Sequence, residues 1–331
     1  MQGFSFIVCS YNPDQIMFRD VVANLLTIMK QSNVESELII VDNNSTPALQ
    51  QSEFLNEILI TNKGVQLLRE NKPGLTFARI AGYQKAKYNW LIFVDDDNLP
   101  GNDYLNELAI LSEKYPKVRC WGAGKIQVVF NNQKETRFLH SLRPLFQERD
   151  FSGVNYSCNI KGEEFYPPGS SMCIQKNVFG KYLELINEGT ITSSDRTGYS
   201  LNSAGDVQII YCCLKFGHAV GCSENLNLKH VISNTKTNLS YLLRLRYALN
   251  SCQIKAFNEI FSDAAVPVKP VTNKELLVAI YSHLRIKNIF PLKNSLLEFA
   301  ATVGMYNARV LAGSFHKPAV LHFFEKLINH R

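Results

Sequence analysis

The chain has 331 residues, 46% of them hydrophobic and 19% charged, as expected of a folded globular protein with one large domain or two. No uninterrupted apolar run reaches the roughly 18 to 20 residues that a bilayer-spanning helix needs, so no membrane span is expected. The formal charge of +6 is unevenly placed, because residues 226–331 hold 14 Lys and Arg against 5 Asp and Glu. This excess predicts either a basic helical tail without further meaning or contact with an anionic phospholipid surface or lipid-linked phosphate.

The N-terminal third of the chain alternates between strand and helix patterns. Short apolar runs that end in polar loops predict four strands, at 4–9, 37–41, 64–70 and 90–94. Small and apolar residues at helical spacing predict two helices, at 14–31 and 74–87. The alternation predicts an α/β fold, with a mostly parallel sheet that carries helices on both faces.

Beyond residue 116 the pattern becomes mixed and then almost wholly helical. Strand patterns return at 125–130 and 171–175, separated by loops such as "FYPPGSS". A helix is predicted over 203–216, with Asp206 in its first turn. Helical patterns fill most of the remainder, over 239–261, 273–286, 294–313 and 317–329. We therefore expect a helical C-terminal extension after the α/β domain.

Polar clusters follow three of the predicted strands. They are Ser10-Tyr11-Asn12, Asp42-Asn43-Asn44 and Asp95-Asp96-Asp97. Ligands of parallel α/β sheets bind at the carboxyl ends of the strands, so the three loops are expected to face one crevice. Consecutive carboxylates repel one another, and such hard oxygen ligands suit Mg²⁺ or Mn²⁺. One acidic run alone is a weak signal, because acidic residues also cap strand ends.

Four stretches match one known family in order and spacing: "FSFIVCSYN", "ELIIVDNNST", "NKPGLTFARIAGYQKAKYNWLIFVDDDNLP" and "GYSLNSAGDVQII". They resemble family 2 glycosyltransferases with the GT-A fold, over residues 3–232. The resemblance implies a Rossmann-like, mostly parallel sheet flanked by helices in a catalytic domain at 1–232. Residues 1–116 would bind the nucleotide sugar, 117–232 would bind the acceptor, and 233–331 would form the helical region.

The resemblance implies inverting transfer of a sugar from a nucleotide-diphosphate sugar, with Mn²⁺ or Mg²⁺ as cofactor. Asp42 matches the carboxylate that accepts the imide N–H of the base, and it also fits an Asx-turn cap. Asp95 and Asp97 match the DxD pair, with Asp97 as metal ligand and Asp95 on the ribose or on the metal. The other positions that match the nucleotide-sugar pocket are Ser10, Tyr11, Asn12, Lys72, Thr76, Arg79 and Asp96, the last of which could instead face its loop.

Asp206 matches the catalytic base of the family. Many members carry an acidic residue directly before it, whereas this chain has Gly205. An aspartate at a helix N-terminus is also favoured by the macrodipole, which is a purely structural alternative. His230 lies where some GT-A enzymes supply a third metal ligand, although a single histidine is more often a packing residue.

Two absent motifs narrow the activity. Only Trp90 and Trp121 occur, so the QxxRW motif of processive polysaccharide synthases is missing, and no GxxxxGK[ST] loop is present. We expect addition of one or a few sugars to a glycan or lipid-linked acceptor, in cell-surface polysaccharide or glycolipid synthesis. The alternatives are a sugar nucleotidyltransferase, disfavoured because "CSYNPDQ" lacks Gly and Lys, and a non-catalytic nucleotide-sugar-binding relative.

The expected donor is a UDP-sugar, with GDP- or dTDP-sugars also compatible, and no nucleic acid is expected as a partner. The N-terminus lacks the basic region of a signal peptide, and the eight cysteines form no CxxC pair. We therefore expect reduced thiols and a cytoplasmic protein, in peripheral contact with anionic membrane at its inner face. The run "YLLRLRYALN", with Arg244 and Arg246 among apolar residues, is the predicted contact segment.

Overall fold

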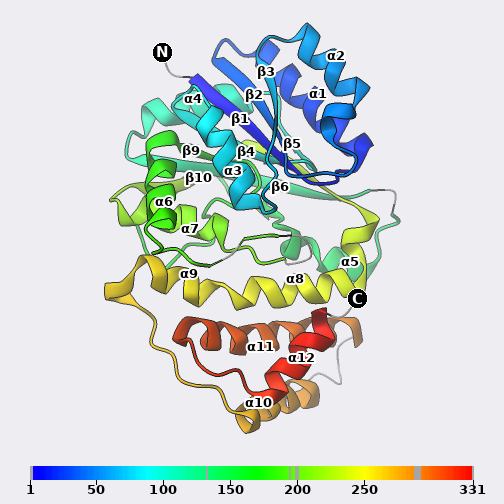
Figure 1. The fold of residues 1–331 in the computed structure, drawn as a ribbon, viewed down its shortest axis with the longest axis vertical. Helices are drawn as coiled ribbons and strands as arrows, with labels where there is room; N and C mark the ends of the chain where they lie inside the picture. The colour runs from blue at the N-terminus through cyan, green and yellow to red at the C-terminus, as the bar shows by residue number, and fades with distance from the viewer. Residues whose placement is uncertain (1–2, 132, 194, 198–200, 287–291, 330–331) are drawn as a thin grey trace. The chain divides into compact units, whose positions relative to one another are not determined.

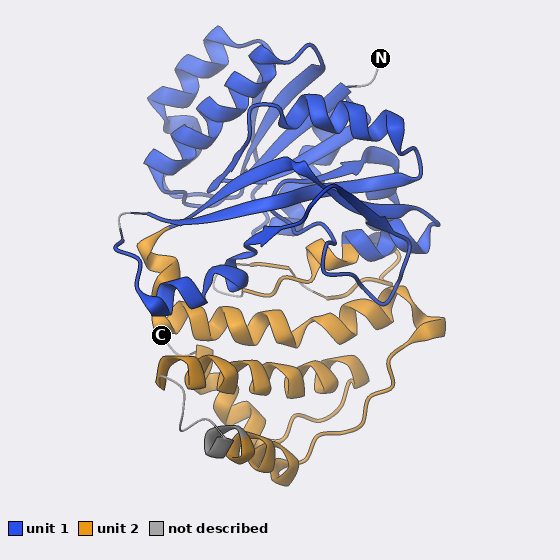
Figure 2. Ribbon diagram, turned by 180° about the vertical axis from the view of Figure 1, so that it is seen from behind, with its two compact units in different colours: residues 1–187, 209–232 blue, residues 188–208, 233–331 orange. Residues whose placement is uncertain are grey.

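The computed structural model describes residues 3–131, 133–193, 195–197, 201–286 and 292–329. The chain divides into two compact units, which Figure 2 distinguishes by colour. Unit 1 comprises Met1–Asn187 and Ile209–Ile232, and unit 2 comprises Glu188–Gln208 and Ser233–Arg331. Residues 188–208, which the sequence assigns to the catalytic domain, thus cluster with the helical unit.

Unit 1 is built around one mixed sheet (Figure 1). Its strands are β1 (Gly3–Ser10), β2 (Glu35–Asp42), β3 (Val65–Arg69), β4 (Trp90–Asp95), β5 (Asn98–Pro100), β6 (Val118–Phe130), β7 (Arg149–Asp150), β8 (Val154–Ser157), β9 (Met172–Gln175) and β10 (Ala219–Ile232). The order is β3-β2-β1-β4-β9-β6-β10-β5, with β7 on β6 and β8 on β10. The β3-β2-β1-β4 part is parallel, as is the β6–β10 pair, whereas β9 runs antiparallel to both of its neighbours.

Helices cover both faces of this sheet. Those of unit 1 are α1 (Gln15–Gln31), α2 (Glu53–Thr61), α3 (Leu75–Lys85), α4 (Tyr104–Lys114), α5 (Arg137–Ser141) and α6 (Lys176–Asn187), with short 3-10 turns η1 (Leu49–Gln51) and η2 (Arg143–Phe146). Helix α7 (Gly205–Lys215) begins in unit 2 and continues into unit 1. The mostly parallel sheet flanked by helices confirms the predicted α/β architecture.

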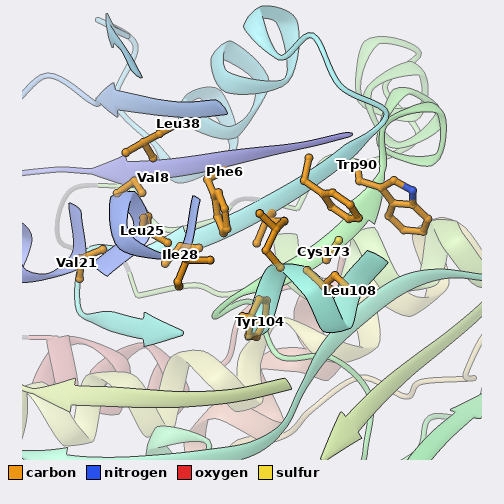
Figure 3. Packing of buried hydrophobic residues seen from close by; sticks show 14 of the residues in the cluster. Phe6, Val8, Val21, Leu25, Ile28, Leu38, Trp90, Tyr104, Leu108 and Cys173 are labelled. Atoms are coloured by element: carbon orange, nitrogen blue, oxygen red, sulfur yellow. The ribbon is translucent and has the colours of Figure 1, made fainter. Parts of the chain in front are cut away.

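Period-2 alternation along the strands separates the two apolar layers. Phe6 and Val8 of β1 pack with Leu25 of α1 and Leu108 of α4 in one buried cluster, drawn in Figure 3. The intervening residues of β1 and β4 face α3 and α6, where the Phe93 ring lies 5.2 Å from the ring of Phe179. Burial of both faces explains why the β1, β2 and β4 sequences are nearly continuous apolar runs.

Helix α3 approaches β1 closely at Gly82. A Cβ added at Gly82 would lie 2.4 Å from Cγ2 of the buried Ile7, a separation that a packed core does not allow. We expect Gly82→Val to lower the free energy of unfolding by about 1–3 kcal/mol through overpacking, measured by urea denaturation. Gln84→Val, at an exposed position of the same helix, should change it by less than about 0.5 kcal/mol. Equal stabilities of the two variants would contradict this packing account.

The longer secondary-structure elements of unit 2, among the described residues, are helices. Its elements are η3 (Asn234–Thr237), α8 (Leu239–Ser251), α9 (Gln253–Ile260), η4 (Ser262–Ala264), α10 (Asn273–Ile286), α11 (Leu292–Gly313) and α12 (Ala319–Asn329). Their shared core includes Tyr247, Leu276, Val303 and Leu321. The single helix predicted over 239–261 is wrong in one respect, because it is divided into α8 and α9 at Cys252.

The predicted membrane-contact segment is largely internal to unit 2. Leu242, Leu245 and Tyr247 of α8 are buried, and Arg246 Nη2 lies 3.1 Å from Glu298 Oε1 of α11. The apolar face of α8 therefore packs on other helices rather than facing solvent. Among the described residues, no helix is both long and apolar enough to cross a membrane.

All eight cysteines are free thiols. Six of them are buried, and burial raises the pKa of Cys212 to about 12. Burial also raises the pKa of Cys173 well above its usual range. These thiols stay protonated at neutral pH, which fits packing residues rather than nucleophiles.

Candidate active site

The carboxyl ends of β1, β2 and β4 meet at one edge of the sheet. In the parallel register Ser10 pairs with Asp42, and Cys9 pairs with Asp95. The Ser10 hydroxyl donates a hydrogen bond of 2.5 Å to Oδ2 of Asp96. Asp96 therefore fastens the loop after β4 to the end of β1, rather than only facing its own loop. Two of the predicted polar clusters are joined directly by this bond.

Asp42 is fully buried and holds the loop that follows β2. Its Oδ1 accepts from Ser45 N at 2.8 Å, and its Oδ2 accepts from Leu49 N at 3.0 Å. Arg69, its register partner at the end of β3, donates to the same Oδ2 at 3.1 Å. The capping role that the sequence allowed for Asp42 is thus present, and its role toward a base stays a prediction. Arg69 was missed in the sequence, although it ends a predicted strand of the same sheet.

Two asparagines connect the strand-end loops. Asn12 has a left-handed φ of 48°, and its Oδ1 accepts from Thr46 N at 2.7 Å. Asn43 Oδ1 accepts from Gly74 N at 2.8 Å, while its Nδ2 donates to Lys72 O at 2.8 Å. Asn43 therefore orients the turn that leads into α3. Tyr11 is more than half exposed beside this network, at 53%.

The predicted pocket residues Lys72, Thr76 and Arg79 lie on α3 or in the turn before it. Lys72 Nζ lies 3.7 Å above the Phe77 ring, and Thr76 is partly exposed. Arg79 is buried, with its guanidinium 5.5 Å from the Phe93 ring centre, so it does not lie on a solvent-exposed face of α3. Arg79 thus places a buried positive charge beside β4, the strand that leads into Asp95, Asp96 and Asp97.

The pairing of β5 with β10 brings Asp97 and His230 together. Val231 N donates to Asp97 O at 2.9 Å, and His230 is the register partner of Asn98. His230 Nε2 lies 3.7 Å from Asp97 Oδ2, and both side chains are largely buried. The sequence separates these two residues widely, and the sheet makes them neighbours.

The tautomer of His230 decides what this pair can bind. Its Nδ1 lies 2.9 Å from the carbonyl oxygen of Phe146. A carbonyl only accepts, so Nδ1 carries a proton, and the neutral form of the ring would present the Nε2 lone pair toward the carboxylate. Metal-binding histidines typically donate their other N–H to a backbone carbonyl in this way. Two acceptors that converge at 3.7 Å fit a shared cation.

No group of three or more His, Cys, Asp and Glu side chains with metal-binding geometry occurs within the described parts of the chain. Two protein ligands are nonetheless what Mg²⁺ and related cations use when substrate phosphates and water complete the shell. Asp97 and His230 therefore suffice as the two protein ligands of such a cation.

The corner at Phe146 and Gln147 supports the site and was missed in the sequence. Gln147 adopts a left-handed φ of 70°, and its Oε1 accepts from the Ser170 hydroxyl. Met172 of β9 pairs with Phe93 of β4 in antiparallel register, so the buried "PPGSS" segment before β9 reaches the aspartate edge. Its signal in the sequence is a Pro- and Gly-rich turn directly before a strand, a pattern that by itself predicts only a loop.

Asp206 lies in the first turn of α7, and it belongs to unit 2 rather than to the cluster of unit 1. Gln208 of the same turn donates to Glu259 Oε2 at 3.2 Å, which ties α7 to α9. Asp206 is partly exposed, whereas Asp195 is buried at 5%. Residues 198–200 of the matching stretch "GYSLNSAGDVQII" lie outside the described residues. The role of Asp206 as a base stays a prediction.

A mostly parallel sheet flanked by helices, with polar loops at its carboxyl edge, is the architecture of the GT-A fold. Residues 5–181, more than half of the chain, match Glycosyl transferase family 2. The chain belongs to this family, which confirms the resemblance found in the sequence. The nucleotidyltransferase alternative is therefore not supported. No curated protein matches the sequence.

Two solved structures align with most of this chain. GalNAc-T7 with UDP, GalNAc and Mn²⁺ aligns with a TM-score of 0.52 at 15% identity. The alignment covers 90% of this chain and 54% of GalNAc-T7, so this chain spans about half of that length. TarS 1-349 of S. aureus aligns with a TM-score of 0.46 at 14% identity, over 95% of this chain and 91% of TarS.

Proposed function

We propose that the protein is a metal-dependent, inverting glycosyltransferase that moves a sugar from a nucleotide-diphosphate sugar to a hydroxyl acceptor. The favoured donor is a UDP-sugar, and GDP- or dTDP-sugars also offer the imide N–H that Asp42 would accept. The acceptor is a glycan or a lipid-linked glycan, in cell-surface polysaccharide or glycolipid synthesis. The missing QxxRW motif supports transfer of one or a few sugars.

The observation that carries this proposal is the convergence of Asp97 Oδ2 and His230 Nε2 at 3.7 Å, on the edge where the strand-end loops meet. A largely buried carboxylate carries a desolvation cost unless a positive charge neutralises it, which favours a cation between Asp97 and His230 over a packing role. Asp97 and His230 would hold Mn²⁺ or Mg²⁺, with Asp95 on the ribose or on the cation's water. The GalNAc-T7 structure contains Mn²⁺ together with UDP, which supports the same classes of cofactor and nucleotide here.

The donor pocket is proposed to use the residues at the ends of β1 and β2 and on α3. Tyr11, more than half exposed, offers a ring on which the base can lie, and Asn12 and Ser10 define the backbone beneath it. Lys72 and the buried Arg79 supply positive charge toward the diphosphate. Thr76, partly exposed in the first turn of α3, offers a hydroxyl to the same pocket.

In the proposed reaction Asp206 accepts the proton of the acceptor hydroxyl as its oxygen attacks C1 of the sugar. The new C1–O bond forms on the face opposite to the breaking C1–O bond of the nucleotide diphosphate, and the configuration at C1 inverts. A bound divalent cation supplies electrostatic stabilisation of the departing diphosphate. Asp97 and His230 would hold the cation and thereby orient the diphosphate end of the donor.

The decisive experiment incubates the protein with UDP-, GDP- and dTDP-sugars, with Mn²⁺, with Mg²⁺ or with EDTA. Thermal stabilisation and slow hydrolysis of the donor are measured together. We expect one nucleotide class to stabilise the protein only when a divalent cation is present, because Asp97 and His230 would hold the diphosphate through that cation. Absence of stabilisation by every nucleotide would contradict the proposal, and stabilisation unaffected by EDTA would remove its metal-dependent part.

We further propose peripheral contact of unit 2 with anionic lipid at the inner face of the membrane, through other helices than the α8 run. Leu277, Val278 and Tyr281 are exposed on one side of α10, and Lys274 lies one turn before them. Exposed apolar residues beside a basic residue are typical of a surface that lies on anionic lipid.

We expect the protein to sediment with vesicles rich in anionic lipid at low salt, and less at high salt, because the electrostatic part is screened. Leu277→Glu should weaken sedimentation relative to Glu37→Gln, a change at a buried position of unit 1. If the wild-type protein fails to sediment at low salt, this contact is wrong, and the exposed residues of α10 need another explanation.

A further inference from the structure

Asn98 is a fully buried polar residue directly after the three aspartates. Within the described residues neither its Oδ1 nor its Nδ2 has a hydrogen-bond partner, and both atoms are inaccessible to solvent. Buried amides are nearly always paired, because an unpaired donor or acceptor retains the full cost of its desolvation. A side chain with both ends unpaired therefore needs an explanation beyond packing.

The strand pairing shows which site this side chain adjoins. Asn98 is opposite His230 in the antiparallel β5–β10 pair, and Val231 N bonds to Asp97 O at the next position. The Asn98–His230 pair is therefore of the non-hydrogen-bonded kind, in which Cα atoms are about 4.5 Å apart and side chains are closest. The two side chains share one face of the sheet. His230 Nε2 on that face is the atom that lies 3.7 Å from Asp97 Oδ2.

We infer that Asn98 is a positioning residue of the Asp97–His230 site, whose amide hydrogen-bonds an oxygen held there together with a divalent cation. This inference rests on the proposed function. The oxygen belongs either to a water on the cation, which can donate to Oδ1, or to the donor diphosphate, which can accept from Nδ2. Mg²⁺ and Mn²⁺ keep such oxygen ligands when only two protein side chains hold them.

With this role, replacement of Asn98 should affect the stability of the metal-free protein and its affinity for Mn²⁺ differently. Replacement of an unpaired buried amide by an apolar group of similar shape is close to neutral or stabilising for the protein alone. Asn98→Leu should therefore leave the melting temperature of the metal-free protein unchanged or raise it. The same change removes an outer-shell hydrogen bond, so Mn²⁺ affinity should fall by about 10- to 100-fold.

The experiment titrates Mn²⁺ into wild-type protein and variants, with free Mn²⁺ followed by electron paramagnetic resonance, first alone and then with UDP. Weaker binding of Mn²⁺ alone in Asn98→Leu identifies a water oxygen, and weaker binding only with UDP identifies a diphosphate oxygen. Asn307→Leu, the same change at a buried asparagine of α11 with an unpaired Oδ1, is the matched control and should bind as wild type. Unchanged Mn²⁺ affinity of Asn98→Leu in both titrations overturns the inference.

A second variant decides the case in which Asn98→Leu lowers the melting temperature. Asn98→Asp keeps the shape and adds a carboxylate beside the proposed cation, so the affinity for Mn²⁺ in the absence of UDP should rise or stay equal. A fall in Mn²⁺ affinity without UDP in this variant overturns the inference. If the wild-type protein binds no Mn²⁺ even with UDP, the proposed metal-dependent function is wrong, and the role of Asn98 is wrong with it. If the wild-type protein binds Mn²⁺ and the variants bind it equally well, only the role of Asn98 is wrong.

Discussion

Asp97→Asn is expected to abolish metal-dependent nucleotide binding while the fold persists. The carboxylate is the harder of the two converging ligands, and an amide oxygen binds a divalent cation far more weakly. Loss of an outer-shell partner already costs about 10- to 100-fold in metal affinity, so loss of a direct ligand should cost more. Titration calorimetry of UDP with Mn²⁺ measures this effect, and circular dichroism checks the fold.

Asp103→Asn is the control for the Asp97 variant. Asp103 precedes α4, is exposed and makes no side-chain capping bond to that helix. The control therefore removes the same charge from the same unit without touching the Asp97–His230 pair, and its binding should equal that of the wild-type protein. If Asp97→Asn also binds UDP with Mn²⁺ as the wild type does, the assignment of Asp97 as a metal ligand is wrong.

Asp206→Asn is expected to retain donor binding and to lose sugar transfer. General-base catalysis typically contributes ~10² to 10⁴ in rate, and the amide keeps the shape of the carboxylate without its basicity. The transfer rate to the true acceptor should fall by about that factor, with the donor dissociation constant unchanged. Rapid-quench transfer assays and donor titration separate the two quantities.

Asp195→Asn tests a second carboxylate as the base, because Asp195 lies shortly before Asp206 in the sequence. Its Oδ1 accepts a hydrogen bond of 2.9 Å from Arg196 N, which gives it a structural role. This variant should be less stable but should transfer sugar at a rate near that of the wild type when folded. Near wild-type transfer by Asp206→Asn, combined with loss in Asp195→Asn, would move the base to Asp195 and return Asp206 to a helix-terminal role.

The first half of the fold could be predicted because its signals are local. The strands at 4–9, 37–41 and 90–94 are apolar runs that are buried on both faces, and Asp14 caps α1 from Oδ1 to the N–H groups of Ile16 and Met17. The strand β10 was missed, although it is the longest strand in the described residues. Its sequence "AVGCSENLNLKHVI" mixes polar and apolar residues, because only part of the strand is buried. Its place in the sheet follows from its partners on both edges, which the sequence does not show.

The candidate site was predictable in its aspartates and less so in what supports them. Acidic residues that follow an apolar strand pattern can be recognised in the sequence. The positions of Phe146 and Gln147 depend on a corner between α5 and β7, which no local sequence pattern predicts. The unpaired amide of Asn98 could not be anticipated at all, because pairing is a property of the assembled sheet. Long-range register, rather than residue type, determines which side chains share a face.

The insertion of β10 between β6 and β5 has a consequence for how the chain acquires its shape. Strands β5 and β6 are synthesised more than a hundred residues before their common partner, so their edges stay unpaired until it arrives. Contacts of such large sequence separation slow folding, and the matched family segment at 5–181 ends before β10 begins. A nascent chain halted after that segment would therefore present open strand edges to other molecules, and it would lack the histidine that faces Asp97.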